Sequence, residues 1–451
     1  MFNIQIPIQV EKIIEALQTA GFKAYAVGGC IRDSILGNLP NDWDICTNAL
    51  PANIKEILNE YKIVDTGLKH GTVTVICDKI PYEVTTFRSE TTYSDNRHPD
   101  SVIFEDNIEQ DLLRRDFTIN ALAYNYSEGL VDLFDGISDI KNKVIKTVGR
   151  ADTRFNEDAL RILRALRFSA ALEFSINNET KESIHRNSLL LKNVAYERIW
   201  SELRKLLLGN NAVNILEEFY DVIGVFIPEI LPMVGFKQNN PYHCYDAWQH
   251  TLVALEHTNN DIAVILSVLL HDIGKPSTYF LDENGVGHFY GHGNESCKIA
   301  DNILQRLRVD NKLKSEVLTL IKYHDIQINN TEKSIMKVIR KLGSEELFEK
   351  LLIVKQCDVK GQSKNLIDKR LKDIDEIKNI YLSMKTKENY ILTLKELNIT
   401  GFDIMDLGIP KGKLVGDILK RLFEMVVNNQ IPNQQIDLLN KVKEVYGDYI
   451  K

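Results

Sequence analysis

The sequence predicts an α+β fold in which a mixed head, residues 1–150, is followed by helices that run to the C-terminus. Short β-branched or aromatic runs, which are typical of strands, occur almost only in the head: AYAV, GTVTVI, YEVTTF and LVDLFD. After Asp152, apolar residues recur at helical spacing and few strand candidates remain. A chain of 451 residues is too long for one compact core, so we expect several domains.

Changes in composition divide the helical part further. Residues 151–240 have plain helical spacing and are predicted to form a neck. Residues 241–360 are rich in His and Asp, and residues 361–451 form a Lys-rich helical tail. With the head, these segments make four predicted domains.

Charge, cysteine usage and hydropathy limit the class of protein. The formal net charge of -8 argues against a strongly basic nucleic-acid coat, although a local basic groove can still bind a phosphate backbone. The cysteines are widely spaced and never form a Cys-x-x-Cys pair, which favours reduced thiols in a cytoplasm. No basic segment followed by a long apolar stretch opens the chain, and the apolar segment Ala263–Leu270 is too short to cross a bilayer. We therefore expect a soluble cytoplasmic protein with no membrane partner.

Two glycines separate the strand-like AYAV from the helix-like CIRDSILG. Gly28 and Gly29 lie where backbone must turn sharply or approach a ligand closely, at the start of a helix. Phosphate could bind there, with Arg32 one turn later as a charged contact. Taken alone, a Gly-Gly pair before a helix is more often only a tight turn.

Two carboxylates follow in the segment NDWDI. Asp42 and Asp44 occupy alternate positions of an extended segment, so both side chains point the same way and can share divalent cations. Two Mg²⁺ ions held there would activate an attacking hydroxyl and neutralise a departing pyrophosphate. Glu83, in YEVTTF, could add a third carboxylate or could simply face solvent.

The segment GGCIRDSILG followed by NDWDI resembles the first motif of class II, bacterial-type CCA-adding tRNA nucleotidyltransferases of the polymerase β superfamily. Four later segments resemble the remaining motifs in family order: LLRRDFTINALAYN, LVDLFDGISDIKNKVIKTVG, RFNEDALRILRALRFSA and YERIWSELRKLL. The resemblance implies a polymerase-β-like head with a mixed sheet, an all-α neck and addition of C, C and A from CTP and ATP to the 3′ end of tRNA. It implies Asp42 and Asp44 as the catalytic Mg²⁺ ligands and Gly29, Arg32 and Arg115 as nucleotide contacts. No obligate protein partner is indicated.

Asp158, Arg161, Arg164 and Arg167 recur every three residues, which predicts one face of a helix. An amphipathic helix with ion pairs is the simplest interpretation. Cytosine and adenine, however, both present an amine beside a ring-nitrogen acceptor, whereas uracil and guanine present a carbonyl beside an N–H. A carboxylate next to a guanidinium matches the first pattern only. The family resemblance gives that role to Asp158 and Arg161, with Arg164 and Arg167 as further nucleotide contacts.

A polar stretch, FRSETTYSDNRHPDSVIFEDN, contains Arg88, Arg97 and Pro99 and is predicted to be a mobile loop. It resembles the flexible element of enzymes that add the terminal A, which disfavours addition of C alone. An A-only enzyme and a poly(A) polymerase stay open as alternatives.

The third predicted domain contains an ordered series of His and Asp residues that resembles the HD superfamily of metal-dependent phosphohydrolases. Such ligands suit one or two divalent transition metals, and a hydrolytic activity could accompany them. An enzyme that is mainly an HD phosphohydrolase with an RNA-binding N-terminal half is a further alternative, against which the intact transfer motifs argue. His243, His257 and His288 do not fit the series, whose members are His250, His271, Asp272, His292, His324 and Asp358.

The tail carries clustered basic residues near several glycines. Backbone amides at helix starts together with these side chains could hold RNA phosphates, although a solvated helical bundle explains the pattern equally well. The family resemblance implies that the tail binds the tRNA body. The basic residues in question are Lys411, Lys413, Lys420 and Arg421.

Overall fold

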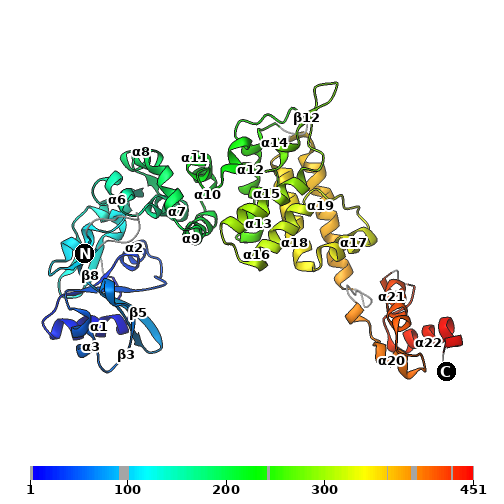
Figure 1. Cartoon of the computed structure of the whole chain (residues 1–451), viewed down its shortest axis with the longest axis horizontal. Helices are drawn as coiled ribbons and strands as arrows, with labels where there is room; N and C mark the ends of the chain where they lie inside the picture. The colour runs from blue at the N-terminus through cyan, green and yellow to red at the C-terminus, as the bar shows by residue number, and fades with distance from the viewer. Residues whose placement is uncertain are drawn as a thin grey trace. The chain divides into compact units, whose positions relative to one another are not determined.

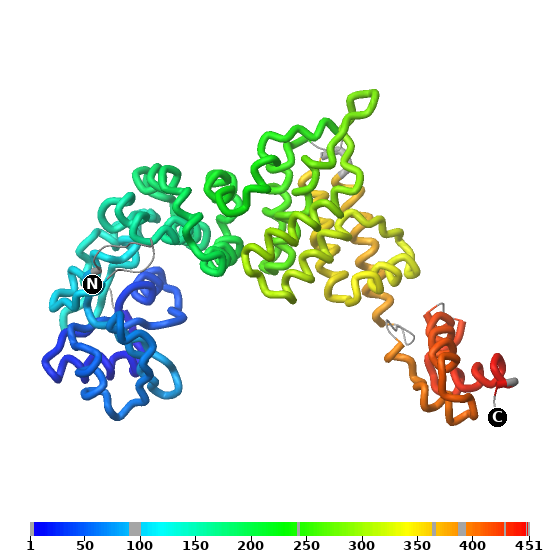
Figure 2. Tube along the Cα trace, viewed as in Figure 1, coloured from blue at the N-terminus to red at the C-terminus, as the bar shows by residue number. Residues whose placement is uncertain are grey.

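The computed structural model describes residues 4–90, 101–240, 244–362, 364–386, 394–427 and 430–449. The chain divides into two compact units, of which one comprises Met1–Leu231 with Ile303–Val309 and the other Pro232–Asn302 with Asp310–Lys451. Figure 2 traces most of the first unit in blue to green and most of the second in green to red. The four narrower domain ranges stay predictions.

The head contains the mixed sheet that the resemblance implied, so the α+β fold class is confirmed (Figure 1). Strand β2 pairs in parallel with β5, and the other neighbours in the order β3-β4-β5-β2-β1-β8-β9 are antiparallel. Strand β1, in the interior of the sheet, is buried along its whole length, as its apolar AYAV sequence requires. The strands are β1 (Ala24–Val27), β2 (Asp44–Thr47), β3 (Lys62–Gly67), β4 (Thr72–Cys77), β5 (Ile80–Thr86), β8 (Leu122–Asn125) and β9 (Gly129–Asp132).

Short helices cover this sheet. Helix α1 (Ile8–Thr19) buries Val10, Ile13, Ile14 and Leu17, which recur at the spacing of one helix face, and it packs on β1, β2 and α3. Helix α2 follows β1 directly in sequence and packs against β1 and β8. The remaining head helices are α2 (Gly29–Ile35), α3 (Pro51–Ile57), α4 (Ile108–Leu113) and α5 (Gly136–Lys141).

The polar stretch predicted as a mobile loop is partly regular. Strands β6 (Arg88–Glu90) and β7 (Val102–Phe104) pair antiparallel at its two ends. Residues 91–100, which include Arg97 and Pro99, lie outside the described part of the chain. The loop prediction is therefore wrong for the flanks, where Val102, Ile103 and Phe104 supply strand-forming side chains.

Helices follow the head within the first unit. Helix α7 packs against α9 and α10 and buries most of its apolar residues. A parallel pair of two-residue strands, β10 (Val144–Ile145) and β11 (Ser175–Ile176), joins the head to this region. The helices are α6 (Ala151–Glu157), α7 (Leu160–Leu172), α8 (Asn178–Asn187), α9 (Tyr196–Leu207), α10 (Ala212–Glu218) and α11 (Tyr220–Ile223).

The prediction that Asp158 shares a helix face with the three arginines is wrong. Asp158 ends α6 in an extended conformation, with φ -137° and ψ 105°, whereas Arg161, Arg164 and Arg167 all belong to α7. Its carboxylate Oδ1 accepts the backbone N–H of Leu160 at 3.1 Å. Asp favours this kind of local side-chain bond over a helix interior, which explains the break.

The second unit is a helical assembly that agrees with the predicted helical remainder. Helix α13 is buried from Ala263 to Leu270, so the apolar segment forms a core helix, and no helix in the described residues is long and apolar enough to cross a membrane. One small hairpin, β12 (Phe280–Leu281) with β13 (Gly287–His288), departs from an all-helical region. The helices before the tail are α12 (Ala247–Leu255), α13 (Ile262–Leu270), α14 (Lys275–Thr278), α15 (His292–Arg306), α16 (Asn311–Tyr323), α17 (Glu332–Leu342) and α18 (Glu345–Lys360), and the tail begins with α19 (Lys364–Lys385).

The tail has a hydrophobic core of its own. Helices α20 (Gly401–Asp406), α21 (Lys413–Val427) and α22 (Gln435–Tyr446) bury Ile404, Ile418 and Leu438 together. The basic residues noted in the sequence, Lys411, Lys413, Lys420 and Arg421, are all exposed.

Candidate functional site

The sheet brings the glycine turn and the acidic residues of the head together at one end of the neighbouring strands β1, β2 and β5. This end is called the acidic edge below, and its carboxylates are Asp42, Asp44 and Glu83. Val27, the last residue of β1, pairs with Asp44 at the start of β2, and Asp44 pairs in turn with Glu83 on β5. Asp42 and Asp44 are exposed on either side of the buried Trp43, as expected for alternate positions of an extended segment. The turn at Gly28, both aspartates and Glu83 therefore gather where β1 ends.

The electrostatics of this edge suit a divalent cation. Burial among protein atoms raises the pKa of Asp44 to about 6, although its side chain still reaches solvent; Arg115 opposes the shift, and Asp42 and Glu83 add to it. Carboxylates that raise each other's proton affinity also attract a hard cation, and oxygen ligands are those that Mg²⁺ prefers. Asp42, Asp44 and, beside them, Glu83 thus fit a magnesium site.

Gly28 is required by its conformation and by its neighbour. Its φ is +88°, and a Cβ placed there would lie 2.9 Å from Nη1 of Arg115. Arg115 forms an ion pair with Asp111, which is completely buried and also forms an ion pair with Arg114. The glycine therefore leaves room for a guanidinium beside the acidic edge, while Gly29 begins α2.

Three predicted nucleotide contacts surround one aromatic ring. The guanidinium carbons of Arg32, Arg164 and Arg167 lie 5.0, 5.3 and 3.7 Å from the ring centroid of Phe168. Each arginine also has a polar partner: Asn120 and Asp33 for Arg32, Asp116 for Arg164 and Glu202 for Arg167. These partners offset the repulsion between the neighbouring positive charges of Arg32, Arg164 and Arg167. The three guanidiniums are therefore already held in place before a ligand binds.

Sequence reasoning missed the residues that hold these arginines. Asp116 and Asn120 belong to the segment LLRRDFTINALAYN, whose polar residues were the available signal. Phe168 and Glu202 occupy ordinary apolar and charged helix positions, so their pattern gave no indication of this role.

Asp158 and Arg161 have separate partners. Nη2 of Arg198 donates to Asp158 Oδ2 at 2.8 Å, and Nη1 donates to Oδ1 at 3.4 Å. Arg161 donates to Glu157 Oε2 at 2.6 Å and to the carbonyl oxygen of Arg114 at 2.9 Å. An acceptor and a donor that are not bound to each other can both serve a third group.

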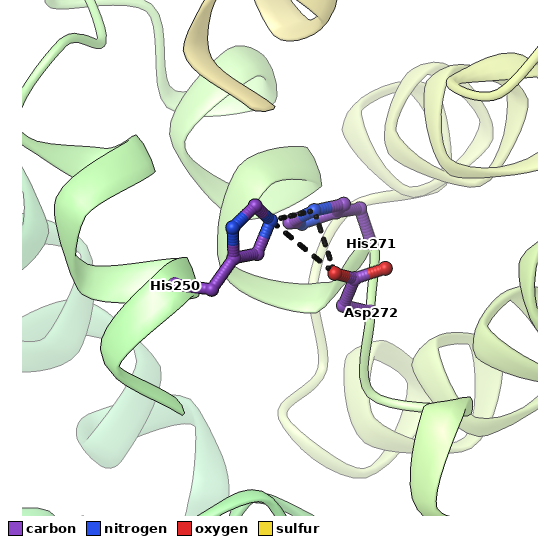
Figure 3. Close-up of side chains that lie close together, drawn as sticks. All are labelled: His250, His271 and Asp272. Atoms are coloured by element: carbon purple, nitrogen blue, oxygen red, sulfur yellow. Dashed lines mark hydrogen bonds and ion pairs between the residues drawn. The ribbon is translucent and has the colours of Figure 1, made fainter. Parts of the chain in front are cut away.

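The predicted series of His and Asp residues converges in the second unit, and Figure 3 shows three of its side chains pointing toward one another. Nε2 of His250 lies 3.4 Å from Nε2 of His271 and 3.4 Å from Oδ2 of Asp272. Asp358 Oδ1 lies 3.1 Å from His250 Nε2. His250, His271 and Asp272 form one group able to hold a metal ion, and Asp272, His292 and His324 form a second. All six predicted residues are thus brought together.

The imidazoles are oriented as metal ligands usually are. Nδ1 of each histidine lies 2.7–2.9 Å from a backbone carbonyl oxygen, which can only accept, so Nδ1 carries the proton and Nε2 faces the cluster. Nε2 of His292 then lies only 3.1 Å from Nε2 of His324. Lone pairs at this distance repel unless a proton or a cation lies between them. The donor set therefore fits a transition metal.

Protonation of this cluster is uneven. Burial lowers the pKa of His324 to about 3, and the neighbouring imidazoles add to the effect, so this ring is neutral. Burial also lowers the pKa of His271, but the carboxylates of Asp272 and Asp358 outweigh it and raise the value to about 10. A metal ion would replace that proton.

A buried lysine and a glycine complete the surroundings. Lys275 Nζ lies 2.6 Å from Asp272 Oδ2 and donates to Gln238 Oε1 at 2.8 Å. Gly361 leaves no room for a side chain, because a Cβ there would lie 2.7 Å from His250 Nδ1. Of the histidines outside the series, His288 binds Asp282 on the hairpin, and His243 lies outside the described residues.

Comparison with known proteins agrees with this geometry. Family models match three segments: the poly A polymerase head domain at residues 24–146, the probable RNA and SrmB-binding site of polymerase A at 173–230, and the putative tRNA nucleotidyltransferase domain 2 at 294–442.

Similar whole proteins are found as well. The CCA-adding enzyme of Ligilactobacillus salivarius (strain UCC118) is 34% identical, with 99% of each chain covered, and that of Pediococcus pentosaceus is 33% identical, with 97% of each covered. A crystal structure of the Bacillus stearothermophilus CCA-adding enzyme in complex with CTP matches 98% of this chain and 100% of its own, with 27% identity and a TM-score of 0.67. The Thermotoga maritima CCA-adding enzyme complexed with tRNA_CCA shares the fold, with 19% identity, a TM-score of 0.62 and coverage of 98% of this chain and 97% of its own. With full-length relatives at this identity, the chain belongs to the family of CCA-adding enzymes, bacterial-type nucleotidyltransferases of the polymerase β superfamily.

Proposed function

We propose that this chain adds C, C and A from CTP and ATP to the 3′ end of tRNA, with release of pyrophosphate. The observation that carries the proposal is the sheet edge where Asp42, Asp44 and Glu83 lie beside the turn at Gly28. The full-length relatives named CCA-adding enzymes support the same reaction. All six cysteines are free thiols, which is consistent with the proposed location in a reducing cytoplasm.

Asp42 and Asp44 would hold divalent cations, Mg²⁺ in the usual case. When bound, such ions activate the attacking 3′ hydroxyl and neutralise the leaving pyrophosphate. Arg115 lies at the same edge, where its guanidinium can bind the triphosphate, and Arg32, Arg164 and Arg167 form the cluster around Phe168. Because their partners fix these arginines in advance, little reorganisation is needed when the nucleotide arrives.

Asp158 and Arg161 would choose the base. The carboxylate of Asp158 would accept a hydrogen bond from the exocyclic amine of C or A, and the guanidinium of Arg161 would donate one to the neighbouring ring nitrogen. Uracil and guanine would leave both groups unpaired, which costs about 1–3 kcal/mol for each buried group.

The alternatives are less well supported. A poly(A) polymerase or an A-only enzyme would use the same carboxylates, but the full-length relatives cited above carry the name CCA-adding enzyme. An RNA-binding N-terminal half without transfer activity does not explain why Asp42, Asp44 and Arg115 are assembled at one edge.

The His and Asp cluster of the second unit would hold a transition metal, and its two groups share Asp272. We therefore expect room for two ions, with His250, His271 and Asp358 on one side of Asp272 and His292 and His324 on the other. Such ions supply a water of lowered pKa for attack on a phosphoester. The exposed basic residues of the tail, including Lys420 and Arg421, would contact the tRNA body.

The first prediction concerns the acidic edge. Asp42→Asn and Asp44→Asn should each lower kcat for nucleotide addition by at least about 100-fold while tRNA binding persists, because only cation binding is lost. Asp65→Asn on strand β3 of the same sheet, which breaks an exposed ion pair with Lys55 of α3, is the matched control and should stay near wild type. Near-normal turnover by either edge variant at saturating Mg²⁺ would show that these carboxylates do not hold the catalytic ions.

The second prediction concerns the product. With CTP and ATP, the protein should extend a tRNA that lacks its 3′ end by C, C and A and then stop, as read by sequencing the product. Extension that ends at CC contradicts the proposal. Failure on this primer together with addition of A to a CC-ended tRNA would establish the A-only alternative instead.

The third prediction concerns base choice. Asp158→Ala should lower the ratio of kcat/KM for CTP over UTP by about tenfold, because one charged acceptor is lost. Arg161→Ala should weaken CTP and ATP together. The measurement uses all four nucleotides on primers that end one position before each addition step. Equal losses for the four nucleotides would mean that base choice is made elsewhere.

The fourth prediction separates the two sites. Asp272→Asn should remove bound transition metal measured by elemental analysis, whereas His250→Ala and His292→Ala should each remove part of it, because the two groups share only Asp272. His288→Ala, which lies outside the cluster, is the control. CCA addition should persist in all four variants. Metal content that stays unchanged in Asp272→Asn would return the cluster to a structural role.

A further inference from the structure

Arg198 is the one guanidinium that binds both oxygens of Asp158 among the described residues. It reaches Oδ2 at 2.8 Å and Oδ1 at 3.4 Å from helix α9, and both side chains are only partly accessible to solvent. Paired contacts of this kind fix the plane of a carboxylate as well as its position.

The carboxylate of Asp158 needs such an external support. Asp158 lies in the extended break between α6 and α7, where its local contact, the backbone N–H of Leu160, reaches Oδ1 and Arg198 supplies the contact to Oδ2. Arg161, three residues away, would be a natural ion-pair partner for it. Arg161 instead donates hydrogen bonds to Glu157 and to the backbone carbonyl of Arg114.

We propose that Arg198 is the positioning residue for base choice: it holds the Asp158 carboxylate apart from Arg161 and turned so that an oxygen stays available to the amine of C or A. A carboxylate has about four acceptor directions, and Arg198 and the N–H of Leu160 account for three of the contacts. One direction on Oδ2 is left for the base. This inference rests on the proposed CCA-adding function.

Helix α9 is built to hold Arg198 still. Its residues Ile199 and Leu203 are 1% exposed, and the helix packs along α7. Glu202, one turn after Arg198, binds Nε of Arg167 at 2.7 Å. Helix α9 therefore supplies a partner to each of two proposed site residues: Arg198 to Asp158, and Glu202 to Arg167.

The test replaces Arg198 by Met, which keeps much of the side-chain volume, and by Lys, which keeps the charge but loses the fork. In Arg198→Met the ratios of kcat/KM for CTP over UTP and for ATP over GTP should fall by about tenfold, as expected for one lost charged hydrogen bond. Arg198→Lys should recover part of each ratio. Arg186→Met, which breaks a more exposed arginine bridge to Asp152 in the same unit, should leave the ratios unchanged.

A double-mutant cycle shows whether Arg198 acts through Asp158. In the Asp158→Ala background, Arg198→Met should cause no further loss of selectivity, because the group it positions is already gone. Full additivity, or an equal loss for all four nucleotides in Arg198→Met, would overturn the inference. If the Met variant fails to fold by circular dichroism, unchanged ratios in Arg198→Lys and Arg198→Gln would overturn it as well. Failure of the wild-type protein to add CCA would contradict the proposed function itself. That result is distinguishable from a failure of the inference about Arg198, which concerns only the selectivity ratios of the variants.

Discussion

The position of β2 between β1 and β5 is the constraint on which the transfer site depends. Antiparallel pairing with β1 sets Asp44 opposite Val27, just before the Gly28 turn, while parallel pairing with β5 sets it opposite Glu83. A slip of one residue in either ladder would turn Asp44 to the other face of the sheet. Strand β1 is buried on both faces, which makes such a slip costly. The acidic edge is thus fixed by apolar residues that do no chemistry.

A second constraint is the balance of charge around the arginines. Five guanidiniums of the first unit, those of Arg32, Arg115, Arg161, Arg164 and Arg167, each contact a carboxylate. These partners and the ring of Phe168 hold like charges close together without a ligand. In the proposed site, an incoming triphosphate would then meet donors that are already oriented, and such preorganisation is the larger part of electrostatic stabilisation. The same partners explain why segments far apart in sequence, such as Asp116 and Arg164, must fold together.

Local patterns predicted what local geometry controls. The alternation of Asp42 and Asp44, the turn at Gly28 and the convergence of the six His and Asp residues all followed from spacing or from family resemblance. The break at Asp158 did not, because a three-residue period looks like a continuous helix until the side chain is seen to bind the N–H of Leu160. Arg198 and Phe168 could not be predicted either. The role of Arg198 depends on how α9 packs on α7, and that of Phe168 depends on the approach of Arg32 from α2. No spacing within one helix contains that information.

Burial of the histidine cluster supports the proposed ligand-binding role over a purely structural one. His250, His271 and Asp272 are at most 1% exposed. The four imidazoles direct Nε2 into the cluster, and each Nδ1–H donates a hydrogen bond to a backbone carbonyl oxygen. A purely structural core would gain more from apolar side chains of similar volume, because desolvating such groups is expensive. Nε2 of the neutral His324 also lies only 3.1 Å from Nε2 of His292, a spacing that suits two ligand atoms of one cation. A divalent cation bound to several of these atoms would offset the cost at once, which supports the proposed metal site beside Lys275.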